Sequence, residues 1–283
     1  MGTEGTLTLA AAYLWGASAA DALFLASLYG AGGPPGLPPF YPSPGKGEAP
    51  PGDGALLAGL PPSFREEGGR LPAKGAARAA AVRRLLADDF LEALLAFEGF
   101  GRALQDRADP AELGAWCRRS GLDYPAVVLA AQKREALFAD VLAAGLNPFW
   151  GHERRLAAAA TPAAFAEAAR RLKRCLFAGL RPRLLEYDAA ANAYRGRHGE
   201  LVAPPPAFTD AALAAAAAAA EGGGREKPRR LVTDRVAIRK APAAAGAPPL
   251  LYRLAPGLVS VLDGAVPDDA AAWEPRRGAA RLY

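Results

Sequence analysis

The sequence predicts an α+β fold in which an N-terminal helical bundle precedes a small antiparallel β-barrel. Up to about residue 180, apolar residues recur at the three- and four-residue spacings of amphipathic helices. Beyond that point, short runs of β-branched and aromatic residues alternate with Gly, Pro, Asn and Asp, as in small β-modules. The chain has 283 residues, of which 51% are hydrophobic, and is therefore long enough to bury a sizeable core.

Residues 1–30 predict two helices that begin the helical part of the fold. The stretches 6–15 and 19–28 are apolar, and Gly16 and Ser18 break the run between them. The whole run has the length of a membrane span and contains one charge, Asp21, so a spanning or signal segment is the alternative. No basic residue precedes the run and Gly16 splits it, so we expect buried helices and no membrane partner.

Residues 31–75 are dense in Pro and Gly and show no sustained period of two or of 3.6 residues. Such a composition offers no apolar face for packing and is typical of flexible linkers. We expect a disordered insertion here, which separates the first two helices from the rest of the bundle.

The bundle is expected to continue over residues 76–180. A core helix is predicted by apolar residues at helical spacing. These residues are Leu85, Phe90, Leu91, Leu94, Leu95 and Phe97. Three further helices are predicted from start and stop signals: one from Pro110, one over 125–144 before Gly145, and one from Pro162 that stops at Gly179.

Residues 181–268 are expected to form the β-module. Its predicted strands are 183–187, 194–197, 201–202, 230–239, 250–254 and 258–262. An Ala-rich helical insertion is expected at 209–224, where the chain runs into three consecutive glycines, and residues 269–283 form a tail. The number and shortness of the strands favour a small barrel or sandwich.

No motif in the chain points to an enzyme. The phosphate-binding pattern GxxxxGK[ST] and the GxSxG and HExxH patterns are absent from the sequence. Two Cys and two His exclude a disulfide scaffold and a zinc cluster. Asp88 and Asp89 are interpreted as helix-capping or solvated charges, and Cys117 as a core residue, rather than as reactive groups. We therefore predict no catalytic residue, no metal ligand and no cofactor in this chain.

Positive charge is concentrated in the C-terminal part. Residues 171–283 carry 18 Lys and Arg against 11 Asp and Glu, whereas residues 1–170 carry 16 against 18. Cations cluster over residues 170–197, interleaved with aromatic residues, where the helices pass into the strands. Cations and aromatic rings on a small β-barrel suit single-stranded nucleic acid, because the cations neutralise phosphates and the rings stack on bases. A solvated helix end is the alternative that this pattern leaves open.

Several segments, taken in order, resemble the C-terminal accessory region of DEAH-type superfamily 2 RNA helicases, particularly the divergent type of large DNA viruses. They are residues 14–30 (LWGASAADALFLASLYG), 88–100 (DDFLEALLAFEGF), 115–124 (AWCRRSGLDY), 145–150 (GLNPFW), 170–180 (RRLKRCLFAGL), 193–205 (AYRGRHGELVAPP) and 227–266. The resemblance implies a helicase-associated ratchet domain followed by an OB-fold, and it covers most of residues 7–268 outside the insertions.

The sequence departs from that family in two respects. Residues 203–206 read Ala-Pro-Pro-Pro where the cellular family has a His-Pro-Ser-Ser element, so contacts made by that element do not carry over. The two RecA-like motor domains and most of the winged-helix domain do not precede Thr6. The resemblance therefore implies a fragment or a relative without its motor, and ATP and Mg²⁺ would act only through that absent motor.

The residues and the resemblance together predict an intracellular module, nuclear or cytoplasmic, that binds single-stranded RNA or DNA and works with helicase motor domains. As part of a longer chain it would belong to an ATP-dependent RNA helicase. The alternative is a protein-interaction module that docks on a motor or on an activating partner. The predicted nucleic-acid contacts are Lys173, Arg174, Arg181, Arg183, Tyr194, Arg195 and Arg197. Tyr194 is the candidate for base stacking, and a place in the barrel core is its alternative.

Overall fold

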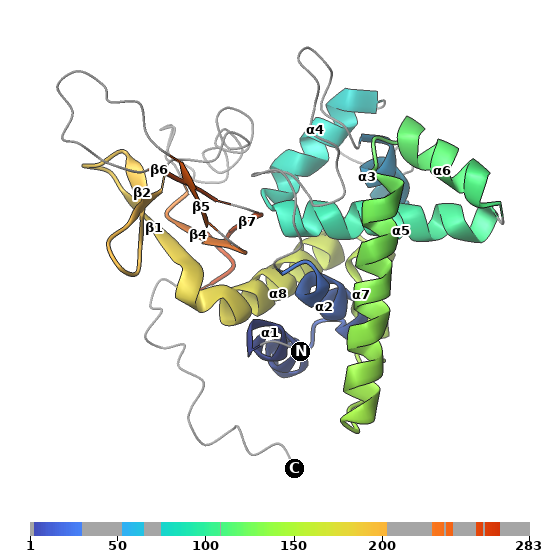
Figure 1. Cartoon of the computed structure of the whole chain (residues 1–283), viewed down its shortest axis with the longest axis horizontal. Coiled ribbons are helices and arrows are strands. Elements are labelled where there is room, and N and C mark those ends of the chain that lie inside the picture. The colour runs from blue at the N-terminus through green and yellow to red at the C-terminus, as the bar shows by residue number, and fades with distance from the viewer. Residues whose placement is uncertain are drawn as a thin grey trace.

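The computed structural model describes residues 3–29, 53–64, 75–107, 109–202, 228–234, 236–239, 253–256 and 258–266. Within them, helices occupy the chain up to residue 180 and strands follow, so that the sheet lies to one side of the helical region (Figure 1). The predicted insertion at 209–224 and the tail at 269–283 lie outside the described residues.

The N-terminal residues form the two expected helices. α1 (Thr3–Trp15) and α2 (Ala19–Ser27) are separated at Gly16, whose φ of 62° is a conformation that glycine adopts readily. Both helices contact α8 (Pro162–Leu180), and together the three contribute to the main apolar core. In the part of the chain that the structure describes, no helix is long and apolar enough to cross a membrane.

Part of the segment predicted to be disordered is folded. α3 (Asp53–Gly59) and a short 3-10 helix (Pro62–Phe64) lie against the bundle. Their buried apolar residues, with the linking Leu60, are Ala55, Leu56, Leu60 and Phe64. The prediction of a disordered insertion over 31–75 is therefore wrong for 53–64, because a helix of seven residues is too short to show a period between Pro- and Gly-rich flanks. Residues 30–52 and 65–74 lie outside the described residues.

α3 approaches the backbone of α5 (Asp89–Asp106) very closely. A Cβ placed on Gly59 would lie 1.7 Å from the carbonyl oxygen of Leu95. One placed on Gly99 would lie 2.3 Å from the carbonyl oxygen of Ala55. Glycine at both positions is what allows the two helices to pack backbone against backbone.

The apolar stripe expected at 85–97 crosses two helices, α4 (Gly75–Leu86) and α5. Ala87, with a φ of 45°, separates them, and the carboxylate of Asp88 caps α5. Leu85 consequently faces solvent and is 53% exposed, whereas the apolar residues predicted from Phe90 onward are buried. The prediction of one continuous helix is wrong at this break, and the core it predicted beyond the break is confirmed.

The remaining helices begin and end at their sequence signals. α6 (Pro110–Arg119) follows Asp109, whose carboxylate accepts a hydrogen bond from the N–H of Ala111 at 2.9 Å. α7 (Tyr124–Ala143) ends before Gly145, which has a φ of 73°. The predictions of these helices, and of α8, are confirmed to within about three residues at each end.

The strands of the described residues form one sheet in the order β5-β6-β3-β2-β1-β4-β7. They are β1 (Leu184–Asp188), β2 (Ala193–Gly196), β3 (Leu201–Val202), β4 (Arg230–Thr233), β5 (Val236–Arg239), β6 (Arg253–Pro256) and β7 (Val259–Val261). Neighbouring strands are antiparallel, except for β3 and β6, which are parallel. The predicted α+β class is thus confirmed.

The predicted barrel is not closed in the described residues, because β5 and β7 stand at opposite ends of the strand order. The outer edge of β7 is covered instead by the chain between α4 and α5. The N–H of Val261 donates to the carbonyl oxygen of Ala87 at 3.3 Å, and Asp88 forms an isolated antiparallel bridge with Ser260. A covered edge satisfies the backbone of β7 without barrel closure.

Candidate nucleic-acid interface

The β1–β2 hairpin presents different residues on its two faces, because side chains alternate along a strand. The residues buried on the inner face, with their neighbours from other strands, are Leu185, Tyr194, Val202, Leu231, Val259 and Val261. On the outer face, Glu186 stands opposite Arg195 of β2 and opposite Arg230 of β4. A row of alternating charges therefore crosses three strands.

Arg195 is exposed and paired within the hairpin. Its guanidinium lies 2.5 Å from the carboxylate of Asp188, and this hydrogen bond keeps the pKa of Asp188 below its ordinary value. Glu186 lies 3.7 Å from the guanidinium of Arg230. Exposed ion pairs contribute little to stability, so Arg195 can exchange its carboxylate partner for a phosphate with little loss.

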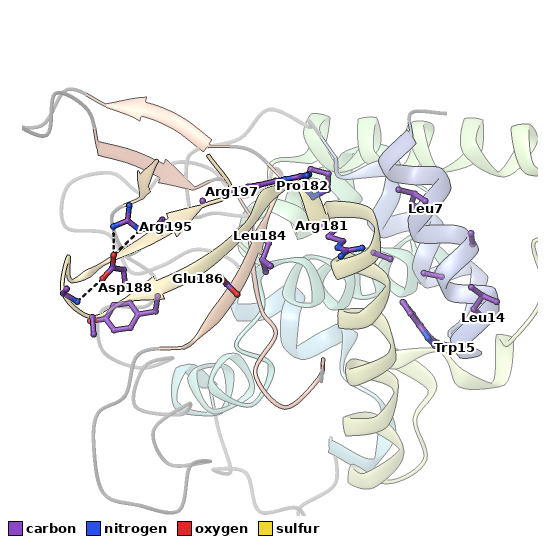
Figure 2. A pocket seen from close by; sticks show the side chains of 17 residues that line it. Leu7, Leu14, Trp15, Arg181, Pro182, Leu184, Glu186, Asp188, Arg195 and Arg197 are labelled. Carbon is purple, nitrogen blue, oxygen red and sulfur yellow. Dashed lines mark hydrogen bonds and ion pairs between the residues drawn. The ribbon is translucent and has the colours of Figure 1, made fainter. Parts of the chain in front are cut away.

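A groove of about 1260 Å³ separates the hairpin from α1. Figure 2 shows Leu7, Leu14 and Trp15 of α1 on one side of the groove, and Asp188 and Arg195 of the hairpin on the other. The groove is larger than the roughly 300–1,000 Å³ of most small-molecule pockets, which favours part of a macromolecule as its occupant.

Two further arginines bring positive charge to this groove. Arg181 begins the 3-10 turn that follows α8 and lies between the two walls (Figure 2), and Arg197 directly follows β2. Both side chains are exposed. Among the described residues, neither guanidinium is within ion-pair distance of a carboxylate. Arg181, Arg195 and Arg197 are thus the predicted contacts that the structure brings together.

Lys173 does not share this surface. Its side chain is 12% exposed, its ammonium donates to the carbonyl oxygen of Leu86 at 2.7 Å, and it lies 4.0 Å from the carboxylate of Asp88. Burial lowers the pKa of Lys173. This arrangement gives Lys173 a structural role between α8 and the start of α5.

Arg174 and Arg183 also contact the protein. The guanidinium of Arg174 donates to the carbonyl oxygen of Ala265 at 2.8 Å. Arg183 lies 2.7 Å from the carboxylate of Glu4, and its side chain is 36% exposed. Arg174 therefore holds the chain after β7, whereas Arg183 links α1 to the turn that leads into β1.

Tyr194 lies in the core of the sheet, which is the alternative that the sequence left open. The residue is 1% exposed, its hydroxyl donates to the carbonyl oxygen of Pro228 at 2.9 Å, and its ring lies 5.5 Å from that of Tyr187. Burial raises the pKa of Tyr194. A ring covered in this way has no face available for stacking on a base.

Sequence reasoning missed the α1 wall of the groove, formed by Leu7, Ala10, Ala11, Leu14 and Trp15. The signal was present, because residues 6–15 carry no charge. It predicted burial of the helix and could not show which face the rest of the chain leaves open.

The fold and the site define an α+β protein with exposed arginines on a hairpin beside an open groove. In the residues that the structure describes, no group of three or more His, Cys, Asp or Glu residues is placed to hold a metal ion. The arrangement suits binding through arginine side chains and an apolar wall.

Comparison with known proteins gives a distant relationship. No family model matches the chain. It is 29% identical over 229 residues to a protein of a South African tick isolate of African swine fever virus, and 28% identical to that of a Kenyan pig isolate, both named "Putative RNA Helicase B962L". The match covers 79% of this chain and 21% of those proteins. The chain is therefore related to a viral protein named as an RNA helicase, and spans about a fifth of its length.

Proposed function

We propose that this chain is an accessory region of a DEAH-type RNA helicase and that it binds single-stranded RNA through the outer face of the β1–β2 hairpin. The observation that carries the proposal is the relationship to the viral protein, which extends over 79% of the chain. The exposure of Arg195 and Arg197, which are two positions apart at the end of β2, supports RNA as the ligand.

The charge of this face indicates how such binding works. Each arginine that meets a phosphate releases bound counterions, so affinity falls as salt rises. Glu186 lies between Arg195 and Arg230 and lowers the net positive charge of the row. We therefore expect the hairpin to contribute a few phosphate contacts to a larger RNA path completed by helicase motor domains.

The test measures binding of a fluorescent oligo(U) strand at several salt concentrations by anisotropy. Arg195→Ala with Arg197→Ala should weaken binding and reduce the slope of log affinity against log salt by about 1.4, because each phosphate contact on a single strand contributes about 0.7. The matched control is Arg118→Ala with Arg119→Ala, two exposed arginines at the end of α6. Absence of RNA binding by the wild-type chain, or an equal effect of the control pair, would contradict the proposal.

A further inference from the structure

α1 carries apolar residues on every side but is only partly covered. Its one charged residue is Glu4, in the first turn. Its buried apolar residues are Leu9, Ala11 and Ala12. Leu7, Tyr13 and Leu14 remain 43%, 63% and 63% exposed. Helices that are hydrophobic all round are normally buried on all sides, so the open face of α1 has the character of an interface.

The open face has the geometry of a helix-binding surface. Leu7, Ala10 and Leu14 stand at positions i, i+3 and i+7 and so share one face of the helix. This spacing is typical of a face that packs against another helix. The small side chain of Ala10 leaves room between the two leucines, and the groove lies over this face.

The rest of the groove lining carries both signs of charge, with three arginines against two acidic residues. Arg195 is neutralised by Asp188 at 2.5 Å, and Glu186 faces Arg230 at 3.7 Å. The charges that remain uncompensated among the described groove residues belong to Arg181 and Arg197. The groove therefore combines an apolar wall with two available cations.

We propose that the face of α1 carrying Leu7, Ala10 and Leu14 is the docking site for an amphipathic, acidic helix of a partner protein. The apolar residues of the partner pack between the two leucines, and its carboxylates meet Arg181 and Arg197. Nucleic acid fits this wall less well, because bases stack on aromatic rings and the wall is aliphatic except for Trp15. The site shares Arg197 with the RNA-binding face proposed above, whereas its apolar wall on α1 is separate from that face, so helix docking does not require RNA binding.

The probe is a fluorescent peptide of about 15 residues, the length at which isolated helices become stable, with Leu at positions i, i+3 and i+7 and Glu beside them. We expect saturable binding to the full chain by anisotropy. Leu7→Glu with Leu14→Glu should weaken it at least about tenfold, because two central apolar contacts are lost and like charges are introduced. Both positions are exposed, so the variant should keep the wild-type circular dichroism spectrum.

The matched control is Leu129→Glu with Leu142→Glu on α7, whose side chains are 51% and 49% exposed. It should leave peptide affinity unchanged. Equal weakening by the control pair, or no binding by the wild-type chain, would overturn the docking site.

Charge reversal tests the nature of the partner. Arg181→Glu should weaken binding of the acidic peptide. It should strengthen binding of a peptide in which every Glu is replaced by Lys. If both peptides bind the wild-type chain with equal affinity, the proposal that the partner is acidic is wrong. A third outcome is that the peptide does not bind, whereas oligo(U) binds the wild-type chain and fails to bind the variant with Leu7→Glu and Leu14→Glu. In that case the open face of α1 is a nucleic-acid site. Peptide binding without any RNA binding would contradict the proposed RNA-binding function and support the docking site.

Discussion

The hydroxyl of Ser260 on β7 donates a hydrogen bond to the carboxylate of Asp88, which caps α5. The same carboxylate accepts a hydrogen bond from the N–H of Leu91 at 3.0 Å and lies 4.0 Å from the ammonium of Lys173. Burial raises the pKa of Asp88 to about 6, against the opposing effect of Lys173. One buried side chain therefore caps the start of α5, joins this helix to β7 and faces a buried cation.

Asp89 extends this connection. Its carboxylate accepts a hydrogen bond from the N–H of Val259 at 3.0 Å, and burial raises its pKa well above the ordinary value. Two consecutive aspartates thus hold β7 against the N-terminus of α5. These contacts join the sheet to the helical region.

Replacing Asp88 by Ala should destabilise the protein more than the loss of an ordinary helix cap. The substitution removes the cap, leaves the hydroxyl of Ser260 without its acceptor and leaves Lys173 without its facing charge. We expect a loss of about 3–5 kcal/mol of unfolding free energy, the range for breaking a buried pair, measured by urea denaturation. Asp109→Ala, which removes the exposed cap of α6, should cost only about 1 kcal/mol. Equal losses would show that the contacts of Asp88 beyond the cap contribute nothing.

The backbone contact between α3 and α5 predicts opposite effects for two glycines. Gly59→Ala should destabilise the protein by at least about 2 kcal/mol, because its Cβ would lie 1.7 Å from a carbonyl oxygen of α5 and the helices must separate. Gly101 lies on an open part of α5, where a Cβ would have no other atom within 4 Å. Gly101→Ala should therefore stabilise the protein by about 0.5–1 kcal/mol. Thermal denaturation of both variants decides this, and a neutral Gly59→Ala would mean that the helices do not pack closely.

The fold was predictable where its signals are local. The start of α6 follows from Asp109, which caps the helix, and from Pro110 at its first position, so both signals lie in the first turn. α3 was not predictable, because its stability comes from glycine contacts with α5, which lies some forty residues further along the chain. Tertiary packing rather than propensity forms that helix.

The candidate site was predictable only in part. Lys173 and Arg197 belong to one basic stretch of sequence, but the chain turns between them, so one faces Asp88 inside the protein and the other lies on the groove. Composition cannot distinguish a buried lysine with a distant carboxylate partner from an exposed one. The apolar stripe of α1 escaped prediction for a related reason, since its exposure depends on where α8 and the hairpin lie.

Tyr194 provides a test of core packing against RNA contact. Tyr194→Phe removes the hydroxyl that donates to the carbonyl oxygen of Pro228, and should reduce the unfolding free energy by about 0.5–1.5 kcal/mol, the usual contribution of one hydrogen bond. Because this hydroxyl is buried and bonded within the protein, RNA affinity and its salt slope should not change in the folded variant. A loss of affinity without a loss of stability would place the hydroxyl of Tyr194 at the RNA instead.

Asp21 predicts a pH dependence of stability with a definite sign. Its carboxylate is 1% exposed and accepts a hydrogen bond from the N–H of Leu156 at 2.8 Å, while the guanidinium of Arg155 lies 3.7 Å away and also pairs with Glu98. Burial raises the pKa of Asp21 from 3.8 to about 7. The folded chain therefore keeps a proton that the unfolded chain releases, and the stability contributed by this group is fully present below pH 3.8 and is lost as pH rises through about 7.

Asp21→Asn isolates this effect, because the amide does not titrate. Measured by urea denaturation, the stability of the variant relative to the wild type should rise between pH 4 and pH 8, by at most about 4 kcal/mol, since each unit of pKa shift corresponds to about 1.36 kcal/mol. Any loss of hydrogen bonding by the amide is independent of pH and shifts the whole curve. Ser18→Ala, which removes the cap of the same helix without removing a titrating group, should differ from the wild type by a constant amount. A constant difference for Asp21→Asn as well would show that this carboxylate is ionised in the folded chain over the whole range, with Arg155 outweighing the effect of burial.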